Sequence, residues 1–305
     1  MNTLDAMNAF ARVAELGSFT QAAASLGLPK ASVSTAVQQL EAQLGTRLLH
    51  RTTRRVSLTQ DGQVFHDRCR DLLDDMDELR TLFQPASGGL NGRLRVDMPI
   101  GVARDHVLPK LPAFLTAHPG LSVELSSTDR RVDLVREGFD CVLRVGALGD
   151  SSLVARPLGA CALVNCASAD YVAQHGQPRT PDELATHRLV HYVTELGARS
   201  PGFEYQADDG QNRFVPMPGA LTVNNSEAYR SACLAGLGIV QVPRVGVADL
   251  LREGRLVEVL PDWRPAPMPV TLLYAHRRNL PRRVQVFMQW LGEAVAPLVA
   301  QSAKA

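Results

Sequence analysis

SFTQAAASLGLPKASVSTAVQQL, residues 18–40, is the stretch that decides the fold of the N-terminal part of the chain. Ser18, with a glutamine three residues later, forms a capping box that starts a helix, and Gly27 ends this helix after one short run. The turn that follows ends in Pro29, which suits the first position of a second helix running to Gly45. Two helices joined by a tight glycine-containing turn predict a helix-turn-helix.

The second helix of this motif has two different faces. Its apolar residues repeat at helical spacing, so they share one face and are expected to pack on the preceding helices. These residues are Val33, Val37, Leu40 and Leu44. Short polar side chains on the other face can reach base edges in the major groove of DNA. The candidate base readers are Ser32, Ser34, Thr35 and Gln38, with Lys30 expected on a phosphate. An ordinary solvated helix face is the alternative for this set.

A basic segment follows the motif. Residues 46–58 are rich in Thr, Val and Leu around a polar centre at 52–54, which predicts two short strands that form a small wing. No acidic residue lies between Glu41 and Asp61, so cations in this window can neutralise DNA phosphates and release counterions. The candidate phosphate-binding residues are Arg47, Arg51, Arg54 and Arg55. A solvated loop is the alternative interpretation.

Two further helices flank the motif and the wing. The first is expected from Asn2 to Gly17, and the second from about Thr59 to Phe83. Apolar residues of the second alternate at spacings of four and three, which predicts a heptad seam and pairing with another copy of the chain. The seam consists of Phe65, Cys69, Leu72, Met76, Leu79 and Phe83. Packing on the core of the chain itself is the alternative.

Three stretches carry the most specific motifs of the chain: FARVAELGSFTQAA at 10–23, LGLPKASVS at 26–34 and LEAQLGTRLLHRTTRR at 40–55. They resemble the signature of LysR-type transcriptional regulators. The resemblance implies a winged helix-turn-helix that binds double-stranded DNA, a linker helix that dimerises, and a homotetramer built from two dimers. It implies the recognition-helix role for Ser32, Ser34, Thr35 and Gln38, and the wing role for residues 51–55.

One position departs from the family pattern. Many similar regulators have Arg after the second recognition serine, where this chain has Thr35. Lys30 or Gln38 is therefore expected to carry more of the contact with DNA.

Small and helix-breaking residues at 85–92, PASGGLNG, predict a linker between domains. Beyond it, short apolar runs alternate with helical segments, which is typical of α/β sheets. The runs expected to be buried strands are 94–98, 121–125, 141–145, 163–166, 221–223, 239–242 and 270–274. The expected domains are a DNA-binding domain at 1–60, a dimerising helix at 61–84, a hinge linker at 85–92 and an effector domain at 93–305.

The resemblance also covers the C-terminal part, more loosely. It implies a type II, periplasmic-binding-protein-like effector domain whose two α/β lobes are joined by crossing strands near residues 156–164 and 267–274. Lobe one is then expected at about 93–160 and 268–305, and lobe two at about 161–267. A small-molecule effector is expected between the lobes.

Open α/β sheets bind ligands beyond the carboxyl ends of their strands, where helix N-termini offer N–H groups to anions. The positions selected in this way are Pro99, Ile100, Gly101, Thr128, Asp129, Arg144, Asn224, Asn225 and Ser226, with Phe203 as an apolar wall. Arg144 is the candidate counter-charge for an organic acid. Helix capping is the alternative for Thr128 and for residues 224–226, and a structural ion pair is the alternative for Arg144.

Similar regulators often have Ser or Thr where this chain has Pro99. That hydroxyl commonly helps to hold a carboxylate, so its absence weakens a simple carboxylate prediction. Backbone N–H groups around Gly101 and the side chain of Thr128 can still serve.

Composition bounds the class of protein. The chain has 305 residues, 45% of them hydrophobic and 21% charged, which predicts two or three folded units. Its first ten residues lack an export signal, and no window approaches the roughly 20 apolar residues that span a bilayer. We therefore expect a cytoplasmic protein without a membrane partner, and this excludes a transport solute-binding protein.

Catalytic and metal-binding motifs are absent from the sequence. There is no G-x-S-x-G elbow, no H-E-x-x-H and no Walker loop, and the G-x-G at 236–238 lacks its third glycine. The cysteines form no C-x-x-C pair, so we expect free buried thiols, no metal, no cofactor and no catalytic residue. The thiols belong to Cys69, Cys141, Cys161, Cys166 and Cys233. A redox switch is the alternative, but Cys161 and Cys166 are expected on opposite faces of one strand, where they cannot pair.

Overall fold

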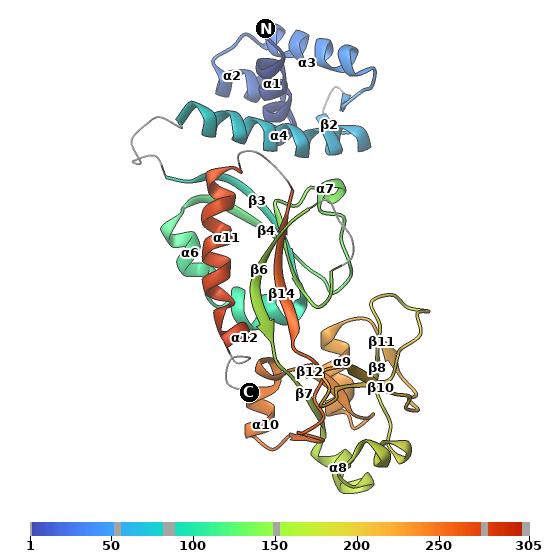
Figure 1. Cartoon of the computed structure of the whole chain (residues 1–305). Coiled ribbons are helices and arrows are strands. Elements are labelled where there is room, and N and C mark those ends of the chain that lie inside the picture. The colour runs from blue at the N-terminus through green and yellow to red at the C-terminus, as the bar shows by residue number, and fades with distance from the viewer. Residues whose placement is uncertain (1, 52–55, 82–88, 149–152, 276–279, 301–305) are drawn as a thin grey trace. The chain divides into compact units, whose positions relative to one another are not determined.

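The computed structural model describes residues 2–51, 56–81, 89–148, 153–275 and 280–300. The chain forms two compact units, which divide after Arg93 (Figure 1). Helices and one small hairpin build the first unit, and mixed α/β layers build the second. The fold class predicted from the sequence is confirmed.

Three helices open the first unit, and their ends follow from local capping. They are α1 (Thr3–Leu16), α2 (Phe19–Leu26) and α3 (Lys30–Leu44). The Ser18 side chain accepts a hydrogen bond from the N–H of Gln21, and Gly27 ends α2 with a left-handed backbone at φ 65°. Pro29 is the N-cap of α3 and not its first helical residue, because its backbone is extended with ψ at 140°. The predicted helix-turn-helix is otherwise confirmed.

The wing and the fourth helix complete the first unit. Strand β1 (Leu49–Arg51) pairs antiparallel with β2 (Val56–Leu58), whereas the predicted turn at 52–54 lies outside the described residues. Helix α4 (Gln60–Thr81) starts after Thr59, whose hydroxyl accepts a hydrogen bond from the N–H of Gly62 at 2.8 Å. A Cβ added to Gly62 would overlap the backbone carbonyl of Leu48. The start of α4 therefore packs directly on the backbone that enters the wing.

One core holds the four helices and the hairpin together. Phe65 lies against this core and Cys69 lies within it, so the heptad seam predicted for α4 is wrong at its first two positions. Leu72 is 42% exposed, whereas the side chain of Leu79 and all of Phe83 lie outside the described residues. Leu44, expected on the buried face of α3, is 44% exposed. Spacing gives the direction of a side chain, but it does not say how far the neighbouring helices extend.

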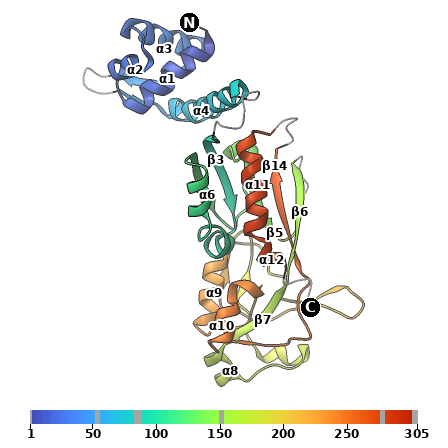
Figure 2. The ribbon, with the colours of Figure 1, turned by 90° about the vertical axis from the view of Figure 1, so that its left-hand side faces the viewer.

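We call residues 94–161 and 268–300 lobe one of the second unit, and the first three residues of β3 belong to the first unit. Its elements are β3 (Asn91–Met98), α5 (Ile100–Val102), the π-helix η1 (Ala103–Val107), α6 (Leu111–Ala117), β4 (Gly120–Ser127), α7 (Leu134–Glu137), β5 (Cys141–Val145), β6 (Val154–Cys161), β14 (Met268–Tyr274), α11 (Arg282–Ala294) and α12 (Ala296–Ala300). The five strands form one sheet in the order β4-β3-β5-β14-β6, with β3 parallel to β5. Helices α6 and α11 lie on the same side of the sheet (Figure 2). The ring centroids of Phe114, on α6, and Phe287, on α11, are 5.6 Å apart.

We call residues 163–267 lobe two. Its elements are β7 (Leu163–Ser168), α8 (Ala169–His175), the 3-10 helix η2 (Pro181–Thr186), β8 (His191–Tyr192), β9 (Phe203–Gln206), β10 (Asn212–Val215), β11 (Thr222–Val223), α9 (Ser226–Leu234), β12 (Val240–Pro243), the 3-10 helix η3 (Arg244–Val247), α10 (Ala248–Arg252) and β13 (Leu256–Glu258). Its central sheet has the order β12-β7-β13, and every residue of β7 is buried. The pairs β9–β10 and β8–β11 form smaller sheets.

Two paired strands connect the lobes. Strand β14 runs antiparallel to β6, with Met268 opposite Cys161, and β7 continues from β6 into lobe two (Figure 1). The predicted crossing segments are therefore confirmed. Cys161 and Cys166 lie on different strands, β6 and β7, which corrects their expected place on one strand.

The seven expected apolar runs all coincide with strands, but four short strands were not predicted. These are β8, β9, β10 and β13, and all of them are only two to four residues long. The linker expected at 85–92 is too long at its C-terminal end, because β3 begins at Asn91. Within the described parts of the chain, no helix is both long and apolar enough to cross a bilayer.

Candidate nucleic-acid interface and effector site

The exposed face of α3 is polar and small. Ser32, Thr35 and Gln38 are exposed on it, Ser34 is half-buried at its edge, and Lys30 is exposed at the start of the helix. The opposite face, with Val33, Ala36, Val37 and Leu40, is buried in the core of the first unit. The core therefore fixes the helix and leaves the predicted base readers accessible. An accessible polar helix of this kind has the dimensions that enter a major groove.

A shallow hollow of about 300 Å³ joins α3 to the segment before the wing. It is lined by Gln38, Glu41, Ala42, Gly45, Thr46 and Arg47. The hollow brings together a predicted base reader, Gln38, and a predicted phosphate ligand, Arg47. Both side chains are exposed, so one surface offers an amide and a guanidinium to the same partner.

Glu41 positions this part of the surface, and it was not among the predicted site residues. Its Oε1 accepts hydrogen bonds from the backbone N–H groups of Leu48 and Leu49, at 2.9 Å and 3.1 Å. The hydroxyl of Thr59 donates to the carbonyl oxygen of Arg47 at 2.7 Å. The backbone that carries Arg47 is thereby held from both sides. A lone glutamate between Gln38 and the basic segment was the available signal.

The wing is only partly described. Arg51 lies on β1 opposite Val56, but its side chain and all of Arg54 and Arg55 lie outside the described residues. His50 is exposed on β1, and Gln39 is exposed on α3. Neither was a predicted site residue. Gln39 follows Gln38 by 100° around the helix, so helical arithmetic could have placed it at the same surface.

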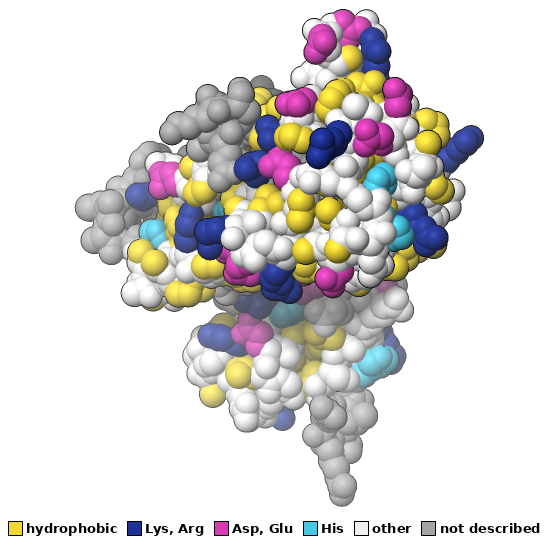
Figure 3. Space-filling model, turned by 90° about the horizontal axis from the view of Figure 1, so that it is seen from below, with side chains coloured by type: hydrophobic (Ala, Val, Ile, Leu, Met, Phe, Trp, Pro, Cys, Tyr) yellow, Lys and Arg dark blue, Asp and Glu magenta, His cyan; other side chains and the backbone are white. Residues whose placement is uncertain are grey.

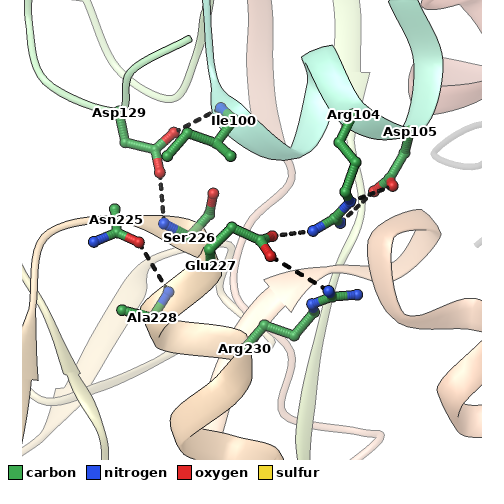
Figure 4. A network of polar contacts seen from close by, with 9 residues as sticks. All are labelled: Ile100, Arg104, Asp105, Asp129, Asn225, Ser226, Glu227, Ala228 and Arg230. Carbon is green, nitrogen blue, oxygen red and sulfur yellow. Dashed lines mark hydrogen bonds and ion pairs between the residues drawn. The ribbon is translucent and has the colours of Figure 1, made fainter. Parts of the chain in front are cut away.

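In the second unit, the predicted effector residues Ile100 and Ser226 are connected by hydrogen bonds to Asp129. The backbone N–H of Ile100, in lobe one, donates to Oδ1 of Asp129 at 3.2 Å. The backbone N–H of Ser226, in lobe two, donates to Oδ2 of the same carboxylate at 2.5 Å (Figure 4). Asp129 therefore bridges the lobes at the ends of β3 and β4, where the strand-end rule expected a ligand.

The remaining predicted residues of lobe two have structural roles or are exposed. The side chain of Asn225 caps α9 by accepting a hydrogen bond from the N–H of Ala228 at 2.8 Å, so the capping alternative is confirmed for this residue. Asn224 is exposed. Phe203 is fully buried in the lobe-two core with Tyr171 and Leu184, and it does not belong to the polar cluster around Asp129.

Two predicted residues of lobe one, Arg144 and Thr128, contact the buried carboxylate of Asp97. Asp97 is completely buried, and Nη2 of Arg144 lies 2.7 Å from its Oδ2. The hydroxyl of Thr128 donates to Oδ1 of Asp97 at 3.2 Å. The ion-pair alternative for Arg144 is thus confirmed. Pro99 is the N-cap of α5, and a Cβ added to Gly101 would lie 4.0 Å from the hydroxyl of Ser226.

A second polar contact between the lobes was missed from the sequence. Arg104 of η1 pairs with Glu227 of α9, and Arg230 lies 3.4 Å from the same carboxylate (Figure 4). Hydrogen bonding to Asp105, with the nearby charge of Glu227, raises the pKa of Arg104 above its ordinary value. The π-helical turn that carries Arg104 has no apolar periodicity that would predict it. Arg104 and Glu227 are also 123 residues apart, so no local sequence pattern indicates their contact.

The five cysteines are all free and buried. Burial raises the pKa of Cys69 to about 12 and that of Cys161 to about 11, so little reactive thiolate forms at neutral pH. Within the described ranges, no group of three or more His, Cys, Asp or Glu side chains is arranged to hold a metal ion. These environments disfavour the redox alternative.

Charge segregation is a feature of the first unit. On the face of the second unit seen in Figure 3, Lys and Arg side chains are interspersed with acidic and hydrophobic ones. The segment from Glu41 to Asp61 in the first unit contains cations and no intervening acid. The acid-free basic segment that suits DNA therefore runs from the end of α3 through β1 and β2.

Known proteins share this arrangement. Residues 4–63 match the bacterial regulatory helix-turn-helix protein domain, lysR family, and residues 87–296 match the LysR substrate binding domain. The HTH-type transcriptional regulator YhjC of Escherichia coli (strain K12) is 50% identical over 95% of this chain and 97% of its own length. An HTH-type transcriptional repressor of Pseudomonas aeruginosa (strain UCBPP-PA14) is 40% identical over 97% of this chain and 93% of its own. The structure of CrgA from Neisseria meningitidis matches with a TM-score of 0.60 and 30% identity, covering 96% of this chain and 98% of that one.

Proposed function

The chain belongs to the LysR family of transcriptional regulators, and from this premise we propose that α3 and the wing bind a specific duplex DNA sequence under the control of a small molecule held between lobes one and two. One observation carries the DNA-binding part of the proposal. The buried face of α3 fixes the helix in the first unit, while Ser32, Thr35 and Gln38 stay exposed, and Gln38 shares a hollow with Arg47.

We propose distinct roles for the residues of this surface. Gln38 and Thr35 read base edges, since amides and hydroxyls discriminate between base pairs in the major groove. Lys30, Arg47, Arg51, Arg54 and Arg55 bind phosphates and position the unit on the duplex. Ser32 and Ser34 contact bases or the neighbouring backbone.

The functional particle is proposed to be a homodimer or a homotetramer. Two-fold symmetric regulators read paired half-sites, and α4 leaves Val64 and Leu72 exposed for contact with another copy. Because the proposed partner is chromosomal DNA, we place the action of the protein in the cytoplasm. The family consists of regulators, so no catalytic role is assigned.

The effector is proposed to be a small organic acid. Two backbone N–H groups, one from each lobe, already converge on a carboxylate at the strand ends, and this supports a site that suits a carboxylate ligand. Thr128 and Arg144 both contact Asp97, and we propose that they support the effector site by holding this carboxylate in place.

A comparison of three variants tests the DNA-binding proposal. Arg47→Ala is expected to weaken binding to every duplex and to reduce the salt dependence of the dissociation constant, because one phosphate contact is lost. Gln38→Ala is expected to change the order of preference among duplexes by about 1–3 kcal/mol at the base it reads. Gln289→Ala, an exposed glutamine of α11, is the control and should behave as the wild type. An equal loss on all sequences from Gln38→Ala would remove Gln38 from the base readers.

A further inference from the structure

The Asp129 carboxylate joins lobe one to lobe two through both of its oxygens. Oδ1 accepts from the N–H of Ile100 at 3.2 Å, and Oδ2 accepts from the N–H of Ser226 at 2.5 Å. Ser226 is the first residue of α9, a nine-residue helix, so its N–H carries the partial positive charge of a helix start. Hydrogen bonds from such N–H groups to a carboxylate are charge-assisted and short.

Other polar groups at this junction are already used. The Asn225 oxygen caps α9, and the Thr128 hydroxyl donates to Asp97. The Arg144 guanidinium pairs with Asp97. The Ser226 hydroxyl differs from them, because its oxygen is buried and has no hydrogen-bond partner among the described residues. The junction therefore has two N–H groups satisfied by a carboxylate and one further hydroxyl that can donate to an anion.

An aromatic ring lies within electrostatic reach of the same carboxylate. Burial, and then the charge of Asp129, raises the pKa of the Tyr192 hydroxyl above its ordinary value. The Tyr192 ring packs against Tyr229 with centroids 5.3 Å apart. An organic acid that displaced Asp129 would thus meet hydrogen-bond donors at its carboxylate and a ring near its apolar part.

The lobes also meet at a second point that does not need Asp129. Arg104 of lobe one pairs with Glu227, which Arg230 of α9 also contacts (Figure 4). If Asp129 withdraws, this ion-pair cluster can keep the lobes close, so the N–H groups of Ile100 and Ser226 stay near each other. The position left by the carboxylate would then accept another anion of the same shape.

We infer that Asp129 is an internal substitute for the effector carboxylate, and that a carboxylate ligand binds by displacing the Asp129 side chain from the N–H groups of Ile100 and Ser226. This inference rests on the proposed function, because it describes how the effector site is regulated. It explains why the site offers N–H donors for a carboxylate, from Ile100 and Ser226, although Pro99 provides no hydroxyl. A purely structural staple would have the same contacts, but an external anion could not replace it.

Chemical rescue separates these two roles. In the full-length protein, Asp129→Ala removes the carboxylate and leaves room for formate, which has the same CO₂⁻ group. Formate, compared with chloride at equal ionic strength, is expected to raise the unfolding midpoint of the second unit in this variant by roughly 2–4 °C. It should leave the wild type unchanged, and neutral formamide should have no effect on either. Asp129→Ser leaves similar room and carries the same expectation.

Matched controls make the test decisive. Asp133→Ala removes a carboxylate that caps α7 in lobe one, and among the described residues this carboxylate bonds within its own lobe, to the N–H of Arg136. It should show no formate response. Benzoate, relative to benzamide, should bind the Asp129→Ala protein at least about tenfold more tightly than the wild type, which corresponds to about 1.4 kcal/mol. Equal formate shifts in the wild type and both Asp129 variants, or equal effects of formamide, would overturn the inference.

Failure of the inference can be told apart from failure of the proposed function. Specific DNA binding without formate rescue overturns the role of Asp129 alone. Formate rescue without any preference among duplexes supports the anion site but overturns the proposed sequence-specific binding of DNA.

Discussion

The Asp97 carboxylate lies 2.7 Å from the Arg144 guanidinium, at the carboxyl ends of the parallel strands β3 and β5. Asp97 is completely buried, and Arg144 is only 14% exposed. A buried charge is tolerated only when it is paired, and the Thr128 hydroxyl adds a hydrogen bond to the same carboxylate. The pair therefore holds the strand ends from which the loops of the effector site leave.

Arg144→Ala is expected to reduce the free energy of unfolding of the second unit by about 3–5 kcal/mol, because it leaves Asp97 buried without a counter-charge. Both tryptophans of the chain, Trp263 and Trp290, lie in this unit, so their fluorescence in a urea titration reports its unfolding alone. Arg252→Ala removes an exposed ion pair with Asp249 and is the control, with little change expected. Equal costs for the two substitutions would contradict the structural role of Arg144.

Gly62→Ala is expected to destabilise the first unit by about 1–3 kcal/mol, because the added methyl group would overlap the carbonyl of Leu48. An unhindered helix would instead gain about 0.5–1 kcal/mol from the same change. The measurement is amide hydrogen exchange in α1 to α4, together with DNA affinity. Gln63→Ala, at an exposed neighbouring position, should leave protection unchanged. Increased protection in the Gly62 variant would rule out close packing of α4 on the wing.

The sequence predicted the first unit better than the second, for physical reasons. Ser18, Gly27 and the stripe from Val33 to Leu40 act within one or two helical turns, so capping and periodicity describe them fully. The β5 strand at 141–145 was predicted because it begins with three consecutive buried apolar residues, whereas the exposed residues of β10 show no apolar run.

The effector site depends on contacts that no local pattern contains. Asp129 and Ser226 are 97 residues apart, and Arg104 and Glu227 are 123 apart. The positions of the strand ends selected Ile100, Asp129 and Ser226. They could not show that the Asp129 carboxylate would accept hydrogen bonds from the other two residues. The same reasoning could not decide whether Arg144 would pair with Asp97 or with an effector, because both roles require a cation near these strand ends.

The first unit is expected to lose stability below neutral pH through His66. Burial lowers the pKa of this histidine despite the opposing charges of Asp67 and Glu15. Since the unfolded chain binds a proton near pH 6.5 and the folded chain does so only at lower pH, unfolding takes up a proton as the pH falls between these values. Stability should therefore fall from pH 7 to pH 5, by at most about 1.4 kcal/mol per pH unit for this one group.

His66→Phe removes the titrating group beside Phe10 and should make the stability of the first unit less dependent on pH. Hydrogen exchange in α1 to α4, corrected for the intrinsic pH dependence of exchange, measures it. His50→Phe, at an exposed wing position, is the control and should keep the wild-type dependence. An unchanged slope after His66→Phe would assign the dependence to other groups.

The native protein is expected to resist thiol modification. All five cysteines are buried, and the pKa values of Cys69 and Cys161 are raised to about 12 and about 11. N-ethylmaleimide should label glutathione long before it labels the folded chain, and should label all five thiols in denaturant, as read by mass spectrometry. Rapid labelling of any thiol in the folded protein, accompanied by altered DNA binding, would restore the redox alternative.

The central claim is that the exposed face of α3, beside Arg47, reads DNA sequence. The most direct measurement is selection of fragments from the organism's own genome by the purified full-length protein, with and without the substitution Gln38→Ala. We predict a small set of enriched fragments that share a two-fold symmetric element, and a different or less defined element for the variant. Uniform recovery of all fragments by the wild-type protein would contradict the account.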